Sequence, residues 1–182
     1  MEGKNIILRP LKEKDLEDFF RFKEKLRLSG SILFFDDLSS EFKFKQKFAK
    51  TGFWEDLEGS TLLLDRKERM LGFISFHRIH FTETLDLSFY IFRPEDRGKG
   101  FMSEALLLFS QYLFSTKKIN RLQLHIPNYN RAAMAVAQKC GFSFEGILRE
   151  ALFCKGQYVD LCLYALLRND VKSLGKSNNS MN

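Results

Sequence analysis

The 182-residue sequence contains only three cysteines and three prolines. Cys140, Cys154 and Cys162 form no C-x-x-C pair and are odd in number, which indicates reduced thiols rather than a disulfide framework. Neither the cysteines nor the three histidines have the spacing of a metal site, so no metal is expected. The sequence also lacks a signal peptide and any apolar run long enough to span a bilayer. We therefore expect a cytoplasmic protein with no membrane contact.

Several ligand-binding patterns are missing as well. The sequence has no G-x-x-x-x-G-K-[ST] loop and no G-x-G-x-x-G that opens a helix. It has no arginine-rich block and no stripe of alternating aromatic and basic residues, so direct nucleic-acid binding is not expected. The net charge of +6 nevertheless suits an anionic ligand or an acidic or ribosomal partner. The lysines at 43, 45, 47 and 50 are most simply explained as a solvated helix face.

The length and the 45% hydrophobic content fit one globular domain, which we place at residues 1–171, followed by a flexible tail at 172–182. Strands interleaved with helices predict a mixed α/β layer fold. The expected strands are Asn5–Arg9, Ser60–Leu64, Met70–Ile79, Leu85–Phe92, Arg121–Ile126 and Asp160–Leu167. The expected helices are Lys14–Leu28, Glu41–Lys50, Phe101–Phe114 and Asn130–Cys140, with Asn130 at an N-cap.

The most informative segment is the glycine-containing basic turn between the strand that ends near Phe92 and the helix that begins near Phe101. A helix start preceded by small residues presents several free backbone N–H groups in one direction. Such a concavity binds phosphate, and Arg97 and Lys99 add positive charge beside it. Alternatively, the glycines only supply positive φ angles to a solvated turn.

The order of motifs around this turn resembles the GNAT superfamily of acetyl-CoA-dependent N-acetyltransferases. The turn is followed by a strand, an Asn-led helix and a Gly-Phe pair at Gly141–Phe142. Further features resemble the RimJ/RimL-like branch that acetylates the N-termini of ribosomal proteins. They are Leu8-Arg9-Pro10-Leu11, Gly72-Phe73-Ile74-Ser75-Phe76, Glu145-Gly146 and Tyr158-Val159-Asp160. The resemblance implies a GNAT-type mixed, mostly antiparallel twisted sheet with helices on both faces.

The resemblance also implies a binding site for acetyl-CoA as co-substrate. Backbone groups of Ile91, Phe92 and Arg93 would pair with the pantetheine arm, and Asn130 would touch it. The pyrophosphate would lie on the turn, at Arg97, Gly98, Lys99, Gly100, Phe101 and Met102. Met102 replaces a small residue of the family pattern, and we expect its side chain to point into the core.

For the catalytic base we predict Asp86, on the strand that leads to the turn, with Glu83 as the weaker candidate. The alternative is that Asp86 is an ordinary exposed carboxylate. Three positions where relatives carry proton-handling side chains are apolar here, namely Ala133, Ala137 and Leu152. Tyr129 and Tyr158 are the remaining candidate proton donors. Acetyl transfer through Cys140 or Cys154 would need an activating histidine, and no pattern supplies one.

Three functions remain open from the sequence. The first is acetylation of a primary amine, with a protein N-terminal α-amine as acceptor. The second is a catalytically degenerate acyl-CoA-binding or partner-binding module, suggested by the three apolar positions. The third is acetylation of a drug or polyamine, which an acidic pocket of Asp36, Asp37 and Glu41 would favour. A homodimer is compatible with the family, and the sequence does not decide it.

Overall fold

A computed structural model of the chain describes residues 1–28, 40–79, 82–154 and 156–171. The predicted tail, Asp36 and Asp37 lie outside these residues. The elements in chain order are β1 (Ile6–Pro10), the short 3-10 helix η1 (Glu13–Asp15), α1 (Leu16–Leu28), α2 (Glu41–Thr51), β2 (Glu58–Asp65), β3 (Met70–Arg78), β4 (Thr84–Ile91), the 3-10 helix η2 (Pro94–Asp96), α3 (Phe101–Thr116), β5 (Arg121–Pro127), α4 (Arg131–Lys139), β6 (Ser143–Cys154) and β7 (Gln157–Leu167).

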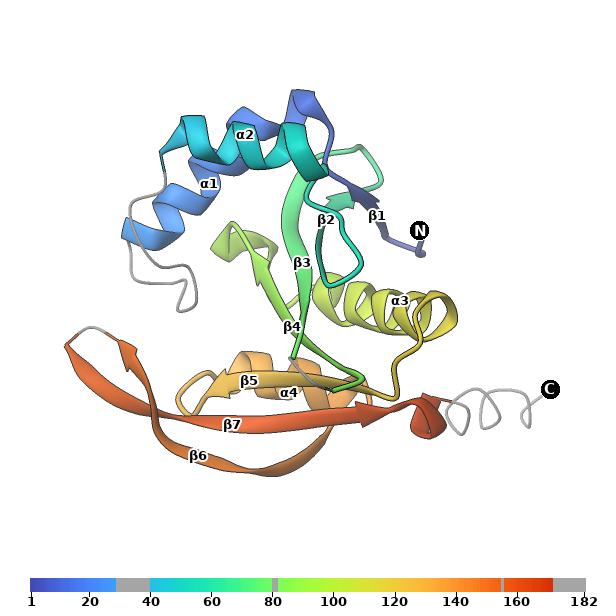
Figure 1. Ribbon diagram of the computed structural model, residues 1–182, viewed down its shortest axis with the longest axis vertical. Helices are drawn as coiled ribbons and strands as arrows, with labels where there is room; N and C mark the ends of the chain where they lie inside the picture. Colours follow the sequence, from blue (N-terminus) through green and yellow to red (C-terminus); the bar gives the residue numbers. More distant parts are fainter. Residues whose placement is uncertain (29–39, 80–81, 155, 172–182) are drawn as a thin grey trace.

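The seven strands form one mixed sheet in the order β1-β2-β3-β4-β5-β7-β6. Every neighbouring pair is antiparallel except β4 and β5, which are parallel. Figure 1 shows the two parts of the sheet diverging, with β2–β4 running across the direction of β5–β7. The expectation of a mixed, mostly antiparallel sheet is confirmed.

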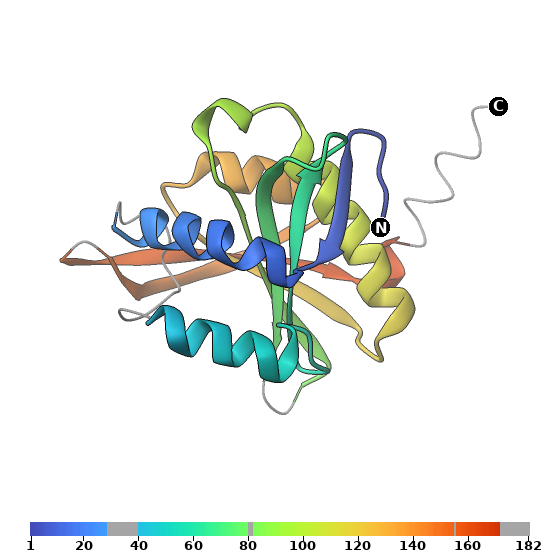
Figure 2. The ribbon, with the colours of Figure 1, turned by 90° about the horizontal axis from the view of Figure 1, so that it is seen from above.

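Two apolar clusters lie on opposite faces of the sheet because side chains alternate along each strand. On β3, Ile74 belongs to the larger cluster, beneath α3 and α4, whereas Phe73 belongs to the smaller one, beneath α1 and α2. Figure 2 shows α1 and α2 as a pair, apart from α3 and α4. Helices therefore cover both faces, as expected.

The long edge strand β6 was not predicted. Most of its residues are exposed, so it lacks the alternation of apolar and polar side chains that identifies a half-buried strand. Its pairing with β7 also shifts register twice, between Phe144 and Gly146 and between Leu148 and Leu152. Glu150, in the second irregularity, has a positive φ of 50°. Bulges of this kind break the periodic signal that a sequence pattern depends on.

The described residues contain neither a membrane-spanning helix nor a cluster of metal ligands. No helix among them is both long and apolar enough to cross a membrane. Among the same residues, no group of three or more His, Cys, Asp or Glu side chains is arranged to hold a metal ion.

Candidate active site

The turn between β4 and α3 holds two glycines in the left-handed region. Gly98 has φ 74° and Gly100, the N-cap residue of α3, has φ 82°. The backbone N–H groups of residues 98–102 have no hydrogen-bond acceptor within the part of the chain that the structure describes. Clustered N–H groups at a helix start bind anions, and the helix dipole adds partial positive charge there. The turn is therefore a candidate anion site made of backbone donors.

A cavity of about 790 Å³ opens beside this turn, and we call it the α3–α4 cavity. Its lining comes from β4, the turn, the start of α3, the length of α4, and the connected ends of β6 and β7. Lys99 and Lys139 contribute positive charge to it. It brings together most of the residues predicted to bind the cofactor: Ile91, Arg97, Gly98, Lys99, Gly100, Phe101, Met102 and Asn130. The Met102 side chain itself is buried in the core, as expected.

The open edge of β4 forms one wall of this cavity. β4 pairs with β5 only from Thr84 to Asp86, so its remaining residues have no strand partner on that side. The Phe92 N–H donates to the Leu71 carbonyl on β3, at 2.8 Å. Because backbone groups alternate in direction along a strand, the N–H and C=O groups of Phe89 and Ile91 point the other way, toward the gap.

Phe92 and Arg93, both predicted to bind pantetheine, lie outside the lining of the cavity. The Phe92 side chain is 5% exposed and packs in the cluster beneath α1. The Arg93 guanidinium donates to the Met70 carbonyl at 2.8 Å and lies over the Phe22 ring. The structure thus gives both side chains packing roles, and Phe89 lines the cavity beside Ile91.

Another wall is formed by α4 and the two residues that precede it. Asn130 is the N-cap, as predicted, and its Oδ1 accepts the Ala133 N–H at 3.1 Å. Next to it, the Tyr129 hydroxyl lies 3.8 Å from Cys154 Sγ. Desolvation, and then the Cys154 contact, raise the pKa of Tyr129, so this hydroxyl keeps its proton at neutral pH and can donate it.

The three apolar residues at positions where relatives carry proton-handling side chains have different surroundings. Ala133 lines the α3–α4 cavity, whereas Ala137 is fully buried in the core. Leu152 and Tyr158 do not line it either, and the exposed Tyr158 ring packs against Phe153. Of the two tyrosines considered as proton donors, the structure places only Tyr129 at the cavity.

An ion-pair network around Asp96 holds the turn between β4 and α3 in place. Asp96 is 2% exposed, and its carboxylate accepts two hydrogen bonds from the Arg69 guanidinium, both at 2.8 Å. Lys99 and Arg93 lie 3.8 and 4.0 Å from the same carboxylate. The hydrogen bonds from Arg69, followed by the attraction of the three cations, lower the pKa of Asp96. Asp96 was missed from the sequence because Arg69 lies 27 residues before it.

We predict that Asp96→Ala lowers the free energy of unfolding by about 1.5–3 kcal/mol, the range for hydrogen bonds to charged groups. Because the folded pKa lies below the ordinary 3.8, Asp96 contributes its stabilisation well above that pH and loses it as the pH falls below it. Urea unfolding at neutral pH and at pH 3 measures both effects. Glu95→Ala, an exposed change in the same short helix, is the control and should have little effect. Equal losses for the two variants would contradict the anchoring role.

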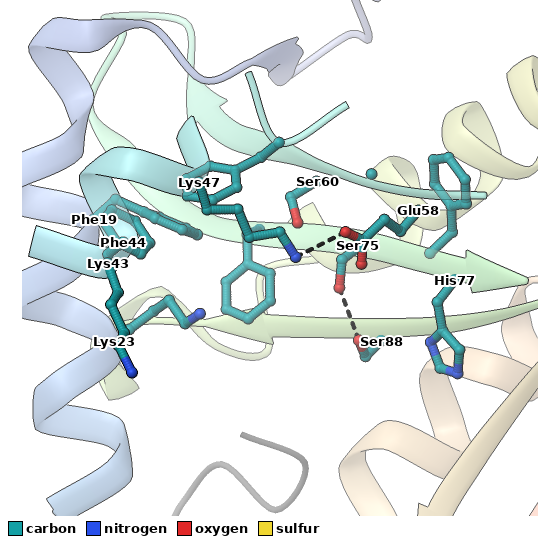
Figure 3. Close-up of a pocket in the computed structure, with 14 residues that line it drawn as sticks. Phe19, Lys23, Lys43, Phe44, Lys47, Glu58, Ser60, Ser75, His77 and Ser88 are labelled. Atoms are coloured by element: carbon teal, nitrogen blue, oxygen red, sulfur yellow. Dashed lines mark hydrogen bonds and ion pairs between the residues drawn. The ribbon is translucent and has the colours of Figure 1, made fainter. Parts of the chain in front are cut away.

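A second pocket, of about 460 Å³, lies on the other face of the sheet, beneath α1 and α2, and we call it the α1–α2 pocket. Phe19 and Phe44 form apolar walls, and Ser75 and Ser88 share a hydrogen bond of 2.8 Å on adjacent strands. Figure 3 shows Lys23 and Lys43 at one end of this pocket and His77 at the other, with Lys47 between them, where it pairs with Glu58 at 2.7 Å. β4 contributes to both sites, with Ser88 in this pocket and Phe89 in the α3–α4 cavity.

Asp86 lies at the point where β4 and β5 separate. Its Oδ1 lies 2.8 Å from His125 Nδ1 on β5, and its Oδ2 lies 3.8 Å from His77 Nε2 on β3. The Asp86 side chain is 13% exposed, whereas the His77 side chain is 61% exposed and lines the α1–α2 pocket. Asp86 is thus a mostly buried carboxylate between two imidazoles rather than an ordinary exposed one. Glu83 instead lies at the surface, 3.9 Å from Lys118.

His77 was not predicted as a site residue. The signal for it was the alternation on β3, where the polar residues Ser75 and His77 interrupt the apolar run that begins at Met70. Alternation places both on one face together with Phe73. Only the tertiary structure shows that α1 and α2 leave a pocket over that face.

Comparison with known proteins gives the family. Residues 5–143, more than half of the chain, match the family described as acetyltransferase (GNAT) domain. The spermidine N(1)-acetyltransferase of Vibrio cholerae is 25% identical over 158 residues, covering 86% of this chain and 89% of that protein. The putative ribosomal N-acetyltransferase YdaF of Bacillus subtilis is 26% identical over 175 residues, covering 92% and 94%.

Solved structures share the fold. A Vibrio cholerae spermidine N-acetyltransferase in complex with CoA and spermine superposes with a TM-score of 0.81 at 22% identity, covering 93% of this chain and 99% of that one. The ribosomal L7/L12 α-N-protein acetyltransferase RimL, in complex with coenzyme A, gives a TM-score of 0.79 at 20% identity, covering 91% and 95%. With the family match and this fold, the chain belongs to the GNAT family and is an N-acetyltransferase.

Proposed function

We propose that the protein transfers the acetyl group of acetyl-CoA to the α-amine of a protein N-terminus. The observation that carries this proposal is the pair of sites on either side of β4. The α3–α4 cavity suits a long phosphate-bearing ligand, and the α1–α2 pocket suits an amine close to a proton acceptor. Relatives are described as acting on polyamines and on ribosomal proteins, so the acceptor has to be argued from this chain's residues.

The residues of the α3–α4 cavity fit acetyl-CoA. The N–H groups of residues 98–102 suit the pyrophosphate, with Arg97 and Lys99 beside them. The outward N–H and C=O groups of Phe89 and Ile91 can pair with the amides of the pantetheine arm, as an added strand would. Acetyl-CoA supplies an activated thioester, and the protein has to hold it in place and manage the protons.

We assign the proton of the attacking amine to the α1–α2 pocket and the proton for the leaving thiolate to the α3–α4 cavity. His77 faces the α1–α2 pocket with Asp86 behind it, and we assign His77 to accept the proton of the attacking amine. Asp86 is the positioning residue that stabilises the resulting imidazolium. Tyr129 is the candidate donor to the leaving thiolate, and a thiol with a pKa near 8.5 leaves at neutral pH with little assistance.

The lining of the α1–α2 pocket does not favour a polyamine as acceptor. Glu58 is the one carboxylate among its described lining residues, and it is already paired with Lys47 at 2.7 Å, so the described lining offers a polycation no unpaired carboxylate. Glu41, one of the residues considered for an acidic pocket, instead pairs with Lys45 at 2.7 Å and does not line it. An α-amine with a pKa near 8 also loses its proton far more readily than a lysine side chain with a pKa near 10.4.

Purified protein, acetyl-CoA and a panel of N-terminal peptides test the proposal, with release of CoA and the mass of the peptide as readouts. We expect one acetyl group per peptide, at the α-amine, and little turnover of spermidine. Acetylation of spermidine with no reaction at any peptide N-terminus would overturn the choice of acceptor and leave the enzyme class unchanged.

A further inference from the structure

A row of three serines crosses the floor of the α1–α2 pocket. Ser60 on β2, Ser75 on β3 and Ser88 on β4 are direct neighbours in the register of the sheet, and all three line the pocket. Figure 3 shows them between His77 and the aromatic end of the pocket at Phe19. Residues of one such row point to the same face of a sheet. The floor therefore presents three hydroxyl groups to the occupant of the pocket.

Ser75 and Ser88 form a pair that keeps one hydroxyl proton for a ligand. Their Oγ atoms lie 2.8 Å apart, and both residues are half-buried. A hydroxyl carries one proton and also accepts through its lone pairs, so one serine donates to the other, and the accepting serine keeps its own proton. Neither hydroxyl has another partner among the residues that the structure describes. The pair therefore offers one O–H donor to a ligand in the pocket.

The pair lies one row away from His77. On β3, His77 is two residues from Ser75 and on the same face, and two residues of an antiparallel strand cover about 6.8 Å. A hydrogen bond of about 2.9 Å from an amine to the imidazole, followed by one residue of extended chain at about 3.3–3.6 Å, covers nearly the same length. An α-amine that donates to His77 therefore brings the carbonyl oxygen of its own residue over the row of serines.

Within the row, the carbonyl is expected over Ser75 and Ser88 rather than over Ser60. Asp86, which lies behind His77, is on β4, and the open edge of β4 faces the cavity assigned to acetyl-CoA. An amine that attacks the thioester has to approach from this side of the sheet. Ser88 is on the same strand as Asp86, whereas Ser60 lies two strands away on β2, about 9.6 Å at the usual strand spacing.

We propose that the Ser75–Ser88 pair donates a hydrogen bond to the carbonyl oxygen of the acceptor's first residue, and so selects amines that stand one carbon from a carbonyl. N-terminal peptides and amino-acid amides belong to this class, whereas polyamines do not. This inference rests on the proposed transfer to an N-terminal α-amine. An acceptor without the carbonyl leaves the O–H donor unpaired in the pocket, and sites that hydrogen-bond a substrate group reject analogues that lack it.

Three acceptors with the same side chains test this inference: an N-terminal peptide, its analogue with a trans alkene in place of the first amide, and its analogue with an ester there. The alkene keeps the shape of the amide and lacks the carbonyl oxygen, whereas the ester lacks only the amide N–H. We expect kcat/KM in the wild type to be at least about 10-fold higher for the peptide than for the alkene, with the difference mainly in KM.

The double variant Ser75→Ala/Ser88→Ala should lower the ratio of kcat/KM between peptide and alkene by about 10-fold, with the rate for the alkene unchanged. The ratio between ester and alkene should fall as well, because the ester keeps the carbonyl. Any difference in amine pKa between the acceptors cancels, since each ratio is compared between two forms of the protein. Each single variant breaks the bond between the serines but keeps one hydroxyl that can donate, so it should lose less than the double variant. If the pair only joined β3 to β4, either single variant would already show the full loss, and the inference would be wrong.

Ser60→Ala is the matched control, because it removes the third hydroxyl of the same row, and it should keep the ratio between peptide and alkene. Acetyl-CoA binding should be unchanged in every variant, since none of the three serines lines the α3–α4 cavity. The same ratio in the wild type and the double variant would overturn the inference and leave the proposed function in place. If no peptide reacts while spermidine does, the proposed function itself fails.

Discussion

Gly100→Asp is expected to lower the affinity for acetyl-CoA by at least about 100-fold. Gly100 is the N-cap of α3, and it lies among the N–H groups assigned to the pyrophosphate. A carboxylate there would stand next to a doubly charged group, where repulsion at about 4 Å is worth several kcal/mol even with substantial screening. The backbone must also keep φ at 82°, which a residue with a Cβ rarely adopts.

A matched control separates the effect of the added carboxylate from the effect of backbone strain at a positive φ. Gly52 has φ 61° at the C-cap of α2, and a Cβ added at Gly52 or at Gly100 would meet no atom within 4 Å. Gly52→Asp therefore introduces the same residue at another left-handed position, remote from the α3–α4 cavity. Titration calorimetry with acetyl-CoA should show binding close to that of the wild type in this control. Similar binding in both variants would contradict the assignment of the turn to the pyrophosphate.

The features of the α3–α4 cavity that the sequence predicted are local ones. Two glycines with positive φ, a helix that begins directly after them and an asparagine at an N-cap are all determined by neighbours within a few residues. Such features depend on backbone geometry and the start of a helix, which a sequence pattern encodes directly. The same pattern included Phe92 in the binding segment, because it could not show that the Phe92 N–H pairs with β3.

The α1–α2 pocket and the surroundings of Asp86 depend on contacts between residues that are distant in the sequence. Lys23 and Lys47 meet only because α1 and α2 pack together over β3, and Asp86 reaches His125 only because β4 and β5 run parallel before they diverge. Neither arrangement has a short spacing in the sequence. The sequence could therefore identify Asp86 as a candidate proton acceptor, but not the imidazole through which we propose it acts.

The proposed role of Asp86, acting through His77, predicts a large effect on catalysis. Asp86→Asn is expected to lower kcat for an N-terminal peptide by about 100-fold near pH 7, within the range for general acid–base catalysis. Asparagine can still hydrogen-bond with His125, but it does not carry the negative charge that stabilises a protonated His77. Acetyl-CoA binding should be unchanged, because Asp86 does not line the α3–α4 cavity. Glu83→Gln, which removes an exposed carboxylate nearby, should leave kcat unchanged.

The pH profile distinguishes this role from a purely structural one. An α-amine with a pKa near 8 is mostly neutral at about pH 9, so the need for a proton acceptor falls and the defect of Asp86→Asn should shrink there. His77→Gln should give a similar defect, and the double variant should lose little more than either single one, since the two side chains act as a unit. A defect of constant size across the pH range would indicate that Asp86 only holds β4 and β5 together. Full activity in His77→Gln would show that water, rather than this imidazole, takes the proton of the amine.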